Sequence, residues 1–167
     1  MLCERVLGNV ESEPGWLAGR QRVRDELDVQ WWELRRRALR KTTRGGRSVR
    51  ILLPLGQSLK QGDVVFDDGS TLVTVCVAQS EVFVAVPGGI EALALACLDL
   101  GNLHVPVQLS GAELWVAPDG PAEAALRGLG VKFELQMRRF CPRFCPGMPE
   151  VALAPDLRIG FEHGKEV

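Results

Sequence analysis

The sequence predicts an α+β protein in which a β-rich half is followed by a half where strands and helices alternate. In the first half, apolar residues alternate with polar ones over short runs, which is the period of a half-buried strand. In the second half, two runs repeat apolar residues at i, i+3, i+4 and i+7, which is the spacing of one helix face. Hydrophobic residues make up 46% of the chain and charged residues 25%, a composition typical of a globular protein.

Residues 1–80 are expected to form a small antiparallel β domain, as a sheet or a barrel. Leu27, Val29 and Trp31 alternate with the residues between them, and "TTRGGRS" then provides a turn before the apolar strand "VRILLPL". The clearest hairpin is "VVFDDGSTLVTVCVA", because its "DDGS" turn tolerates positive φ angles and β-branched runs flank it.

Residues 81–140 begin with the strand "EVFVAV", and the "PGG" that follows it leads into a helix. Gly101-Asn102 is expected to end this helix in a left-handed turn. The segments "HVPVQLS" and "ELWVAP" are typical of two strands joined by a glycine-containing turn. The apolar face of the helix is expected to consist of Ile90, Leu93, Ala94 and Cys97.

A second helix is expected between Asp119, which can cap its N-terminus, and Gly130, which can end it. The strand "VKFELQM" follows and completes the order βαββαβ, which is the ferredoxin-like arrangement. That arrangement hosts many unrelated activities, so it indicates no function by itself. Residues 141–167 are rich in proline and glycine and are expected to form a mobile tail. The expected core face of the second helix is Ala122, Ala125, Leu126 and Leu129.

The charges are segregated, although the net charge is only −1. Residues 34–62 contain no acidic side chain, and this stretch has two interpretations: a surface for an acidic partner or nucleic acid, or a solvated strand face with its turn. The nearly neutral net charge of the whole chain does not favour nucleic acid or a membrane as a partner. The basic residues of the stretch are Arg35, Arg36, Arg37, Arg40, Lys41, Arg44, Arg47, Arg50 and Lys60.

The N-terminal segment "MLCERVLGNV" lacks the apolar core of a signal peptide, and the number of cysteines, 5, is odd. Both features favour a reducing, cytoplasmic location. Cys3, Cys76 and Cys97 are expected to behave as small buried apolar residues.

Few residues can act as metal ligands or catalysts, because the chain has only 2 histidines. His104 lies where the first helix of the second half gives way to a strand, and a neutral imidazole there can bind zinc, copper, iron or nickel. One histidine cannot hold a metal alone, but a homodimer with His104 on its two-fold axis offers two. His163 is a second candidate ligand in the tail, and it is also interpretable as a simple tail residue.

Cys141 and Cys145 have the spacing C-x₃-C, which could bind a soft metal or could mean two ordinary thiols in a loop. Asp99 and His104 could be an acid–base pair of a small ferredoxin-like enzyme, but no nucleophile lies near them in sequence. The chain is therefore expected not to be an enzyme.

The segment "LGNLHVPVQL" resembles the signature of the urease accessory protein UreE family, whose members are nickel metallochaperones, and that signature is similar to LGNRHxPxQ. The likeness extends upstream through "LPLGQSLKQGDVVFDDG" and downstream through "ELWVAPD", "ALRGLGV" and "FCP". It covers roughly residues 20–142.

The resemblance implies an N-terminal domain similar to a chaperone peptide-binding module, which would meet partner proteins, and a ferredoxin-like domain that forms a homodimer. His104 matches the metal histidine of the family, which both subunits contribute at the dimer interface. The implied function is delivery of Ni²⁺ to urease apoprotein through the accessory GTPase complex, with Zn²⁺ or Cu²⁺ as further ions bound in vitro.

Two departures from the family pattern favour an alternative, a metal-independent assembly scaffold that acts through the β domain. Leu103 stands where the family usually has arginine, and the histidine-rich tail of other members is reduced to His163. Carriage of one ion per dimer is therefore expected rather than storage of many.

Overall fold

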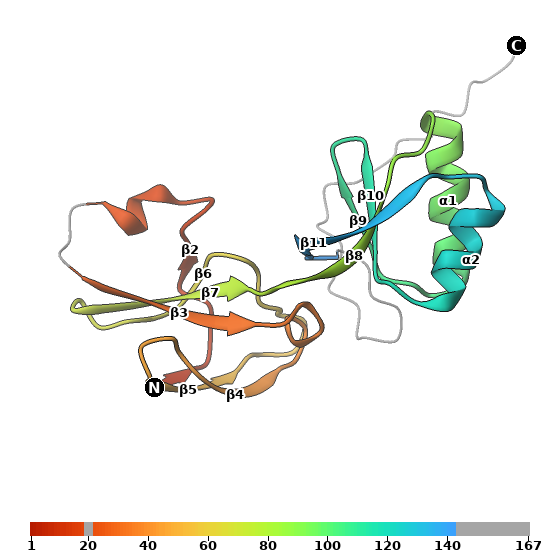
Figure 1. Ribbon diagram of the computed structural model, residues 1–167. Helices are drawn as coiled ribbons and strands as arrows, with labels where there is room; N and C mark the ends of the chain where they lie inside the picture. The colour runs from red at the N-terminus through yellow and green to blue at the C-terminus, as the bar shows by residue number, and fades with distance from the viewer. Residues whose placement is uncertain (19–21, 143–167) are drawn as a thin grey trace, which may run out of the picture.

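The computed structural model describes residues 1–18 and 22–142 and shows a β domain followed by an α/β domain (Figure 1). The N-terminal strands are β1 (Leu2–Cys3), β2 (Gly8–Asn9), β3 (Val23–Val29), β4 (Ala38–Thr42), β5 (Ser48–Leu52), β6 (Asp63–Asp67) and β7 (Thr71–Val77). The C-terminal elements are β8 (Gln79–Ala85), α1 (Ile90–Asn102), β9 (Val107–Ser110), β10 (Glu113–Val116), α2 (Gly120–Gly128) and β11 (Phe133–Arg139). The α+β class and the two-domain order are confirmed.

The N-terminal strands form two sheets, with the orders β1-β5-β4 and β2-β6-β7-β3. Both sheets contribute to one core, in which Leu27, Val49, Ile51 and Val73 are almost fully buried. The expected hairpin β6–β7 is confirmed, with Gly69 at a φ of 84° in its turn. Two pairs, β1–β5 and β3–β7, are parallel, a feature that the expectation of an antiparallel domain did not include.

The first strand predicted from alternation is shorter than expected. Strand β3 ends at Val29, and Trp31–Glu33 form a 3₁₀ turn instead of continuing the strand. The backbone N–H of Gln30 donates to Glu33 Oε2 at 2.9 Å, as part of a capping box that favours the turn over an extended chain. The turn redirects the Trp31 ring, which packs against the buried cores of both domains.

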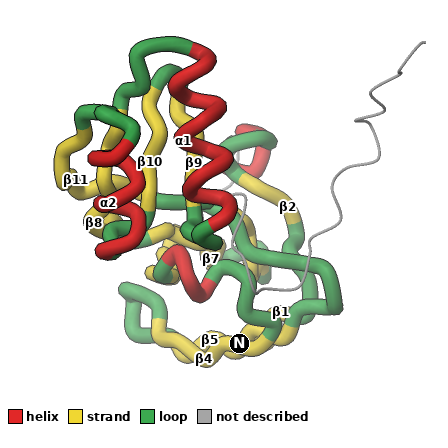
Figure 2. The backbone as a smooth tube through the Cα atoms, turned by 90° about the vertical axis from the view of Figure 1, so that its right-hand side faces the viewer, coloured by secondary structure: helices red, strands yellow, loops and turns green. Residues whose placement is uncertain are grey.

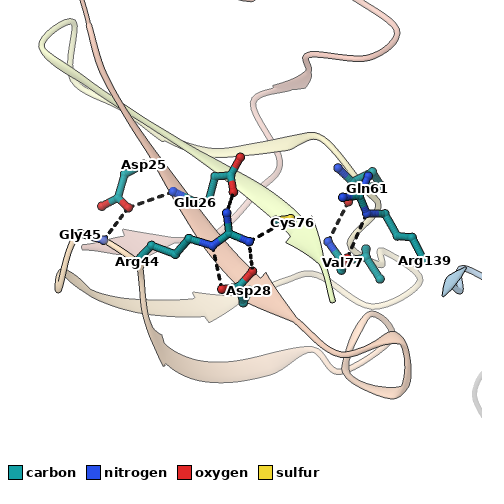
Figure 3. Close-up of polar contacts among 9 residues, drawn as sticks. All are labelled: Asp25, Glu26, Asp28, Arg44, Gly45, Gln61, Cys76, Val77 and Arg139. Atoms are coloured by element: carbon teal, nitrogen blue, oxygen red, sulfur yellow. Dashed lines mark hydrogen bonds and ion pairs between the residues drawn. The ribbon is translucent and has the colours of Figure 1, made fainter. Parts of the chain in front are cut away.

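The turn between β4 and β5 is built around the buried carboxylate of Asp25 on β3 (Figure 3). Asp25 accepts hydrogen bonds from Thr43 Oγ1 at 2.6 Å, from the Gly45 N–H at 2.8 Å and from Arg47 Nη1 at 2.7 Å. A Cβ at Gly45 would lie 2.6 Å from the Asp25 carboxylate, so a side chain there would displace this contact. Burial raises the pKa of Asp25, but these hydrogen bonds outweigh it and lower the pKa to about 2.

The C-terminal domain is the expected ferredoxin-like fold. Its sheet has the order β11-β8-β10-β9 with antiparallel neighbours, and both helices cover one face of it (Figures 1 and 2). Helix α2 begins as expected, because Asp119 Oδ1 accepts a hydrogen bond from the Ala122 N–H at 2.7 Å. Its predicted core face is confirmed, with Ala122 and Leu126 fully buried and Ala125 and Leu129 packed at the edge of the core.

The predicted face of α1 is partly wrong. Ala96 and Leu100 are its buried residues, whereas Ile90, which the prediction placed in the core, is 86% exposed. Ala94 is also exposed. Apolar residues occur on almost every side of this helix, so their spacing alone could not indicate which side faces the sheet.

The two domains are joined by a continuous extended chain. Ala78 alone separates β7 from β8, and its N–H donates to the carbonyl of Val29 at 2.9 Å. Strand β11 returns along β8 to the same place, where Arg139 Nε donates to the Val77 carbonyl at 3.1 Å (Figure 3). The next residue, Phe140, is fully buried with its ring centroid 5.2 Å from that of Trp31.

We expect Asp25→Asn to lower the free energy of unfolding at neutral pH by about 2 kcal/mol, because hydrogen bonds to a charged group are lost. The folded-state pKa lies below the unfolded value, so this stabilisation is present above about pH 4 and is lost as the pH falls towards about 2. Urea unfolding of both proteins across this range measures the difference. A difference that stays constant with pH would contradict this role of the carboxylate.

We expect Phe140→Ala to cost about 3 kcal/mol of stability, because it removes a large side chain from a closed contact between the domains. Calorimetry should then separate the unfolding of the two domains, which the wild-type contact couples. Phe133→Ala is the matched control, since Phe133 pairs with Phe83 inside the C-terminal domain at 4.9 Å. A single, equally cooperative transition in Phe140→Ala would show that this ring does not couple the domains.

Candidate functional site

His104 ends helix α1 in a strained backbone conformation. Its φ is 58°, and it is the one residue other than glycine with a positive φ in the described part of the chain. The His104 N–H donates to the Gly101 carbonyl and the Val105 N–H donates to the Leu100 carbonyl, each at 3.0 Å. This pair of bonds defines a Schellman motif, in which the residue after the cap must be left-handed.

The structure therefore corrects the expected position of the left-handed turn. Gly101 and Asn102 remain helical, and the turn falls on His104 itself. The reason is the burial of Val105, which packs in the same core as Leu100 and fixes where the helix closes.

Helix α2 ends in the same motif with glycine at the equivalent position. The Gly130 N–H donates to the Arg127 carbonyl and the Val131 N–H to the Leu126 carbonyl, each at 3.0 Å, and the φ of Gly130 is 68°. A left-handed residue with a side chain costs about 1 kcal/mol or more, although histidine tolerates this region better than most. Helix α2 therefore ends at an unstrained glycine, whereas α1 ends at a strained histidine. Backbone strain of this kind is typical of functional positions.

His104 is exposed, and so is the apolar residue that precedes it. Leu103 is 46% exposed beside it. The outer side of α1 carries Ile90, Ala94 and Leu98 on successive turns, and Leu98 is 60% exposed. A continuous apolar strip on a surface helix is typical of a protein–protein contact.

No group of three or more histidine, cysteine or carboxylate side chains lies close enough to hold a metal ion within residues 1–18 and 22–142. His104 is the candidate ligand that the structure describes, whereas His163 and Cys145 lie outside the described residues. A single imidazole does not chelate an ion, so a metal at His104 requires donors from another chain or from solvent.

The described cysteines are not arranged as ligands. Cys141 is half-buried against the N-terminal core, and its N–H donates to Gln108 Oε1 at 2.6 Å. Burial raises the pKa of both Cys141 and Cys97, which disfavours the thiolate form that binds metals. Cys3 and Cys76 are buried, as the sequence predicted, whereas Cys97 is only half-buried.

Comparison with known proteins identifies the family. The sequence model described as UreE urease accessory protein, N-terminal domain, matches residues 3–78, and the model of the C-terminal domain of the same protein matches residues 80–153. The chain belongs to the UreE family. The family resemblance inferred from the sequence is thereby confirmed, and the family name describes an accessory protein rather than an enzyme.

Curated relatives with the name urease accessory protein UreE support this membership. The protein of Actinobacillus pleuropneumoniae is 37% identical over 131 residues, which is 77% of this chain and 70% of the relative. That of Haemophilus influenzae strain PittGG is 34% identical over 139 residues, covering 83% and 75%. That of Acetivibrio thermocellus is 30% identical over 131 residues, which is 78% of this chain and 83% of the relative.

The described part of the chain contains no helix long and apolar enough to span a membrane.

The sequence pointed to His104 but not to the conformation that distinguishes it, nor to the exposed strip on α1. The signal for the strip was present in the sequence, because α1 has more apolar positions than one buried face can use. The left-handed turn had no local signal, since Gly101-Asn102 is the more obvious place for it.

We expect His104→Gly to be at least as stable as the wild type and about 1 kcal/mol more stable than His104→Ala, because only glycine is unstrained at this φ. Gly130→Ala is the matched control at the other helix end; it should lose about 1 kcal/mol, since its Cβ would meet no atom within 4 Å and only the backbone is strained. Urea unfolding measures all three. Equal stability of His104→Gly and His104→Ala would refute the strain.

Proposed function

We propose that this protein is a metallochaperone that carries Ni²⁺ for urease assembly, with His104 from two chains binding one ion. The observation that carries the proposal is the exposed, left-handed His104 where glycine would fit without strain. Membership of the UreE family supports the role in urease assembly. Imidazole nitrogen is a suitable donor for Ni²⁺, and for Zn²⁺ and Cu²⁺ in vitro.

A homodimer supplies the second ligand. The strip formed by Ile90, Ala94 and Leu98 leads along α1 to Asn102, two residues before His104. In a two-fold dimer the same surface meets itself, so packing of this strip against its copy would bring the two His104 rings together near the axis. Leu103 then adds apolar contact at the position where family members usually carry arginine.

The proposed site suits transfer rather than storage. Two protein donors leave the remaining coordination positions of the ion to water or to an acceptor protein, so the ion can be exchanged. A metal binds imidazole through an unprotonated nitrogen, and nickel affinity is therefore expected to fall at acid pH. His163 is proposed as an auxiliary ligand.

The domains divide the task in this proposal. Residues 81–140 form the metal-binding and dimerisation domain, residues 1–80 form the domain that binds partners, and residues 141–167 form the tail. The partners are urease apoprotein and its accessory GTPase complex. The two domains are in contact through Trp31 and Phe140, which supports delivery of the ion close to a partner bound at the N-terminal domain.

Calorimetric titration with Ni²⁺ tests the site. The wild type should bind one ion per two chains, and His104→Ala should lose at least about tenfold in affinity, which is about 1.4 kcal/mol. Leu98→Asp should give a monomer with the same loss, because it places a charge in the dimer contact. Leu55→Asp is the matched control, since Leu55 is 76% exposed in the other domain.

Unchanged nickel affinity and stoichiometry in His104→Ala would refute the metal site. If the same variant also retained capture of urease apoprotein in the presence of a chelator, the metal-independent scaffold would replace the carrier. Nickel bound by the Leu98→Asp monomer as tightly as by the wild type would refute the shared site but not the ligand.

A further inference from the structure

The outer face of the sheet β1-β5-β4 is polar, basic and open to solvent. Strands β4 and β5 lie at the base of the N-terminal domain in both views (Figures 1 and 2). Alternate residues of each strand point into the core, such as Leu39 and Ile51, and those between them are exposed. The exposed set on the two strands is Ala38, Arg40, Thr42, Ser48, Arg50 and Leu52.

Arg40 lies directly opposite Arg50 across this face. Like charges in a cross-strand pair repel one another, and neither guanidinium has a carboxylate within ion-pair distance among the described residues. Their neighbours in the basic stretch differ: Lys41 pairs with Glu33, Arg44 with Glu26 and Asp28, and Arg47 with Asp25. The positive charges of Arg40 and Arg50 are therefore not neutralised by an ion pair on the outer face among the described residues.

Strand β4 also has a free hydrogen-bonding edge. The N–H of Thr43 donates to the Arg47 carbonyl, and the N–H of Leu53 donates to the Arg37 carbonyl. Hydrogen-bonded pairs recur at every second residue of an antiparallel ladder, so Ala38, Arg40 and Thr42 direct their N–H and C=O groups away from β5. No further strand pairs with β4 in the part of the chain that the structure describes.

An open hollow of about 630 Å³ lies over this face, with Arg40 and Arg50 in its lining. Its apolar lining includes Ala38 and Leu52, which are opposite one another in the ladder. The hollow thus offers two cationic groups and apolar contact, and the unpaired backbone groups of the β4 edge lie beside it.

We propose that this surface binds an extended acidic segment of a partner protein, which adds to β4 as a further strand. Backbone hydrogen bonds from Ala38, Arg40 and Thr42 would hold the segment. Alternate side chains of an added strand point to the same face, so its carboxylates would meet Arg40 and Arg50 while an apolar side chain packs on Ala38 and Leu52. The occupant is a peptide in which acidic and apolar side chains take turns at every second position, so that both kinds lie on the face that meets Arg40 and Ala38.

The same features disfavour other occupants. A second copy of this chain paired edge to edge would bring more arginines beside Arg40 and Arg50, which charge repulsion opposes. A nucleic acid would satisfy the guanidinium groups but has no backbone that can complete the β4 ladder. The proposal is independent of nickel, because its residues belong to the N-terminal domain and His104 belongs to the C-terminal domain.

Fluorescence anisotropy with a labelled peptide that repeats Glu-Ser-Val-Ser, in which glutamate and valine share one face of the extended strand, tests the proposal on the full chain. Arg40→Glu and Arg50→Glu should each weaken binding at least about tenfold, and raised salt should weaken wild-type binding. Lys132→Glu makes the same change of charge on an exposed residue of the other domain and should leave binding unchanged. His104→Ala should also bind the peptide normally, which separates this result from the nickel proposal.

Ala38→Pro tests the edge. Its N–H points away from β5, so proline should leave the fold intact, but its ring would obstruct an added strand. Circular dichroism should show a wild-type spectrum and anisotropy a loss of peptide binding. Binding that survives Ala38→Pro, or equal effects of Lys132→Glu and Arg40→Glu, would overturn the proposal. Tighter binding of a labelled oligothymidylate than of the peptide would overturn it in favour of nucleic acid.

Discussion

The burial of Val105 against Leu100 is the constraint from which the character of His104 follows. Because Val105 is packed in the core, the helix has to end just before it. The residue before Val105 is His104, which therefore takes the left-handed conformation. The backbone of His104 is consequently fixed at the surface, at the end of a helix whose exposed residues include Ile90 and Leu98.

Packing of a few buried side chains also joins the two domains. The chain crosses from β7 to β8 through Ala78, returns by β11, and places Phe140 against Trp31. Trp31 is available for that contact only because the capping box of Gln30 and Glu33 ends β3 in a 3₁₀ turn. The N-terminal and C-terminal domains are thereby in direct contact through packed aromatic side chains.

The basic stretch of the sequence divides into two kinds of charge in the fold. Some of its members face β3 and are neutralised by the acidic residues of that strand, including Asp25 and Asp28. Arg40 and Arg50 face the opposite way and repel one another. The stretch contains only basic charges in the sequence, but these have two roles in the fold. One group forms structural ion pairs, and the other forms a surface that favours an anionic partner.

The amino-acid sequence alone determined the class of fold, the order of the C-terminal elements, the hairpin at Gly69 and the candidate ligand His104, because each of these depends on local periodicity, turn chemistry or a motif. Tertiary structure decided the rest. The buried side of α1, the parallel pairs of the β domain, the left-handed turn at His104 and the exposure of Arg40 depend on which surfaces meet. Local sequence does not indicate which side of a helix is buried when most sides are apolar. It also does not indicate which of two possible turn positions is used.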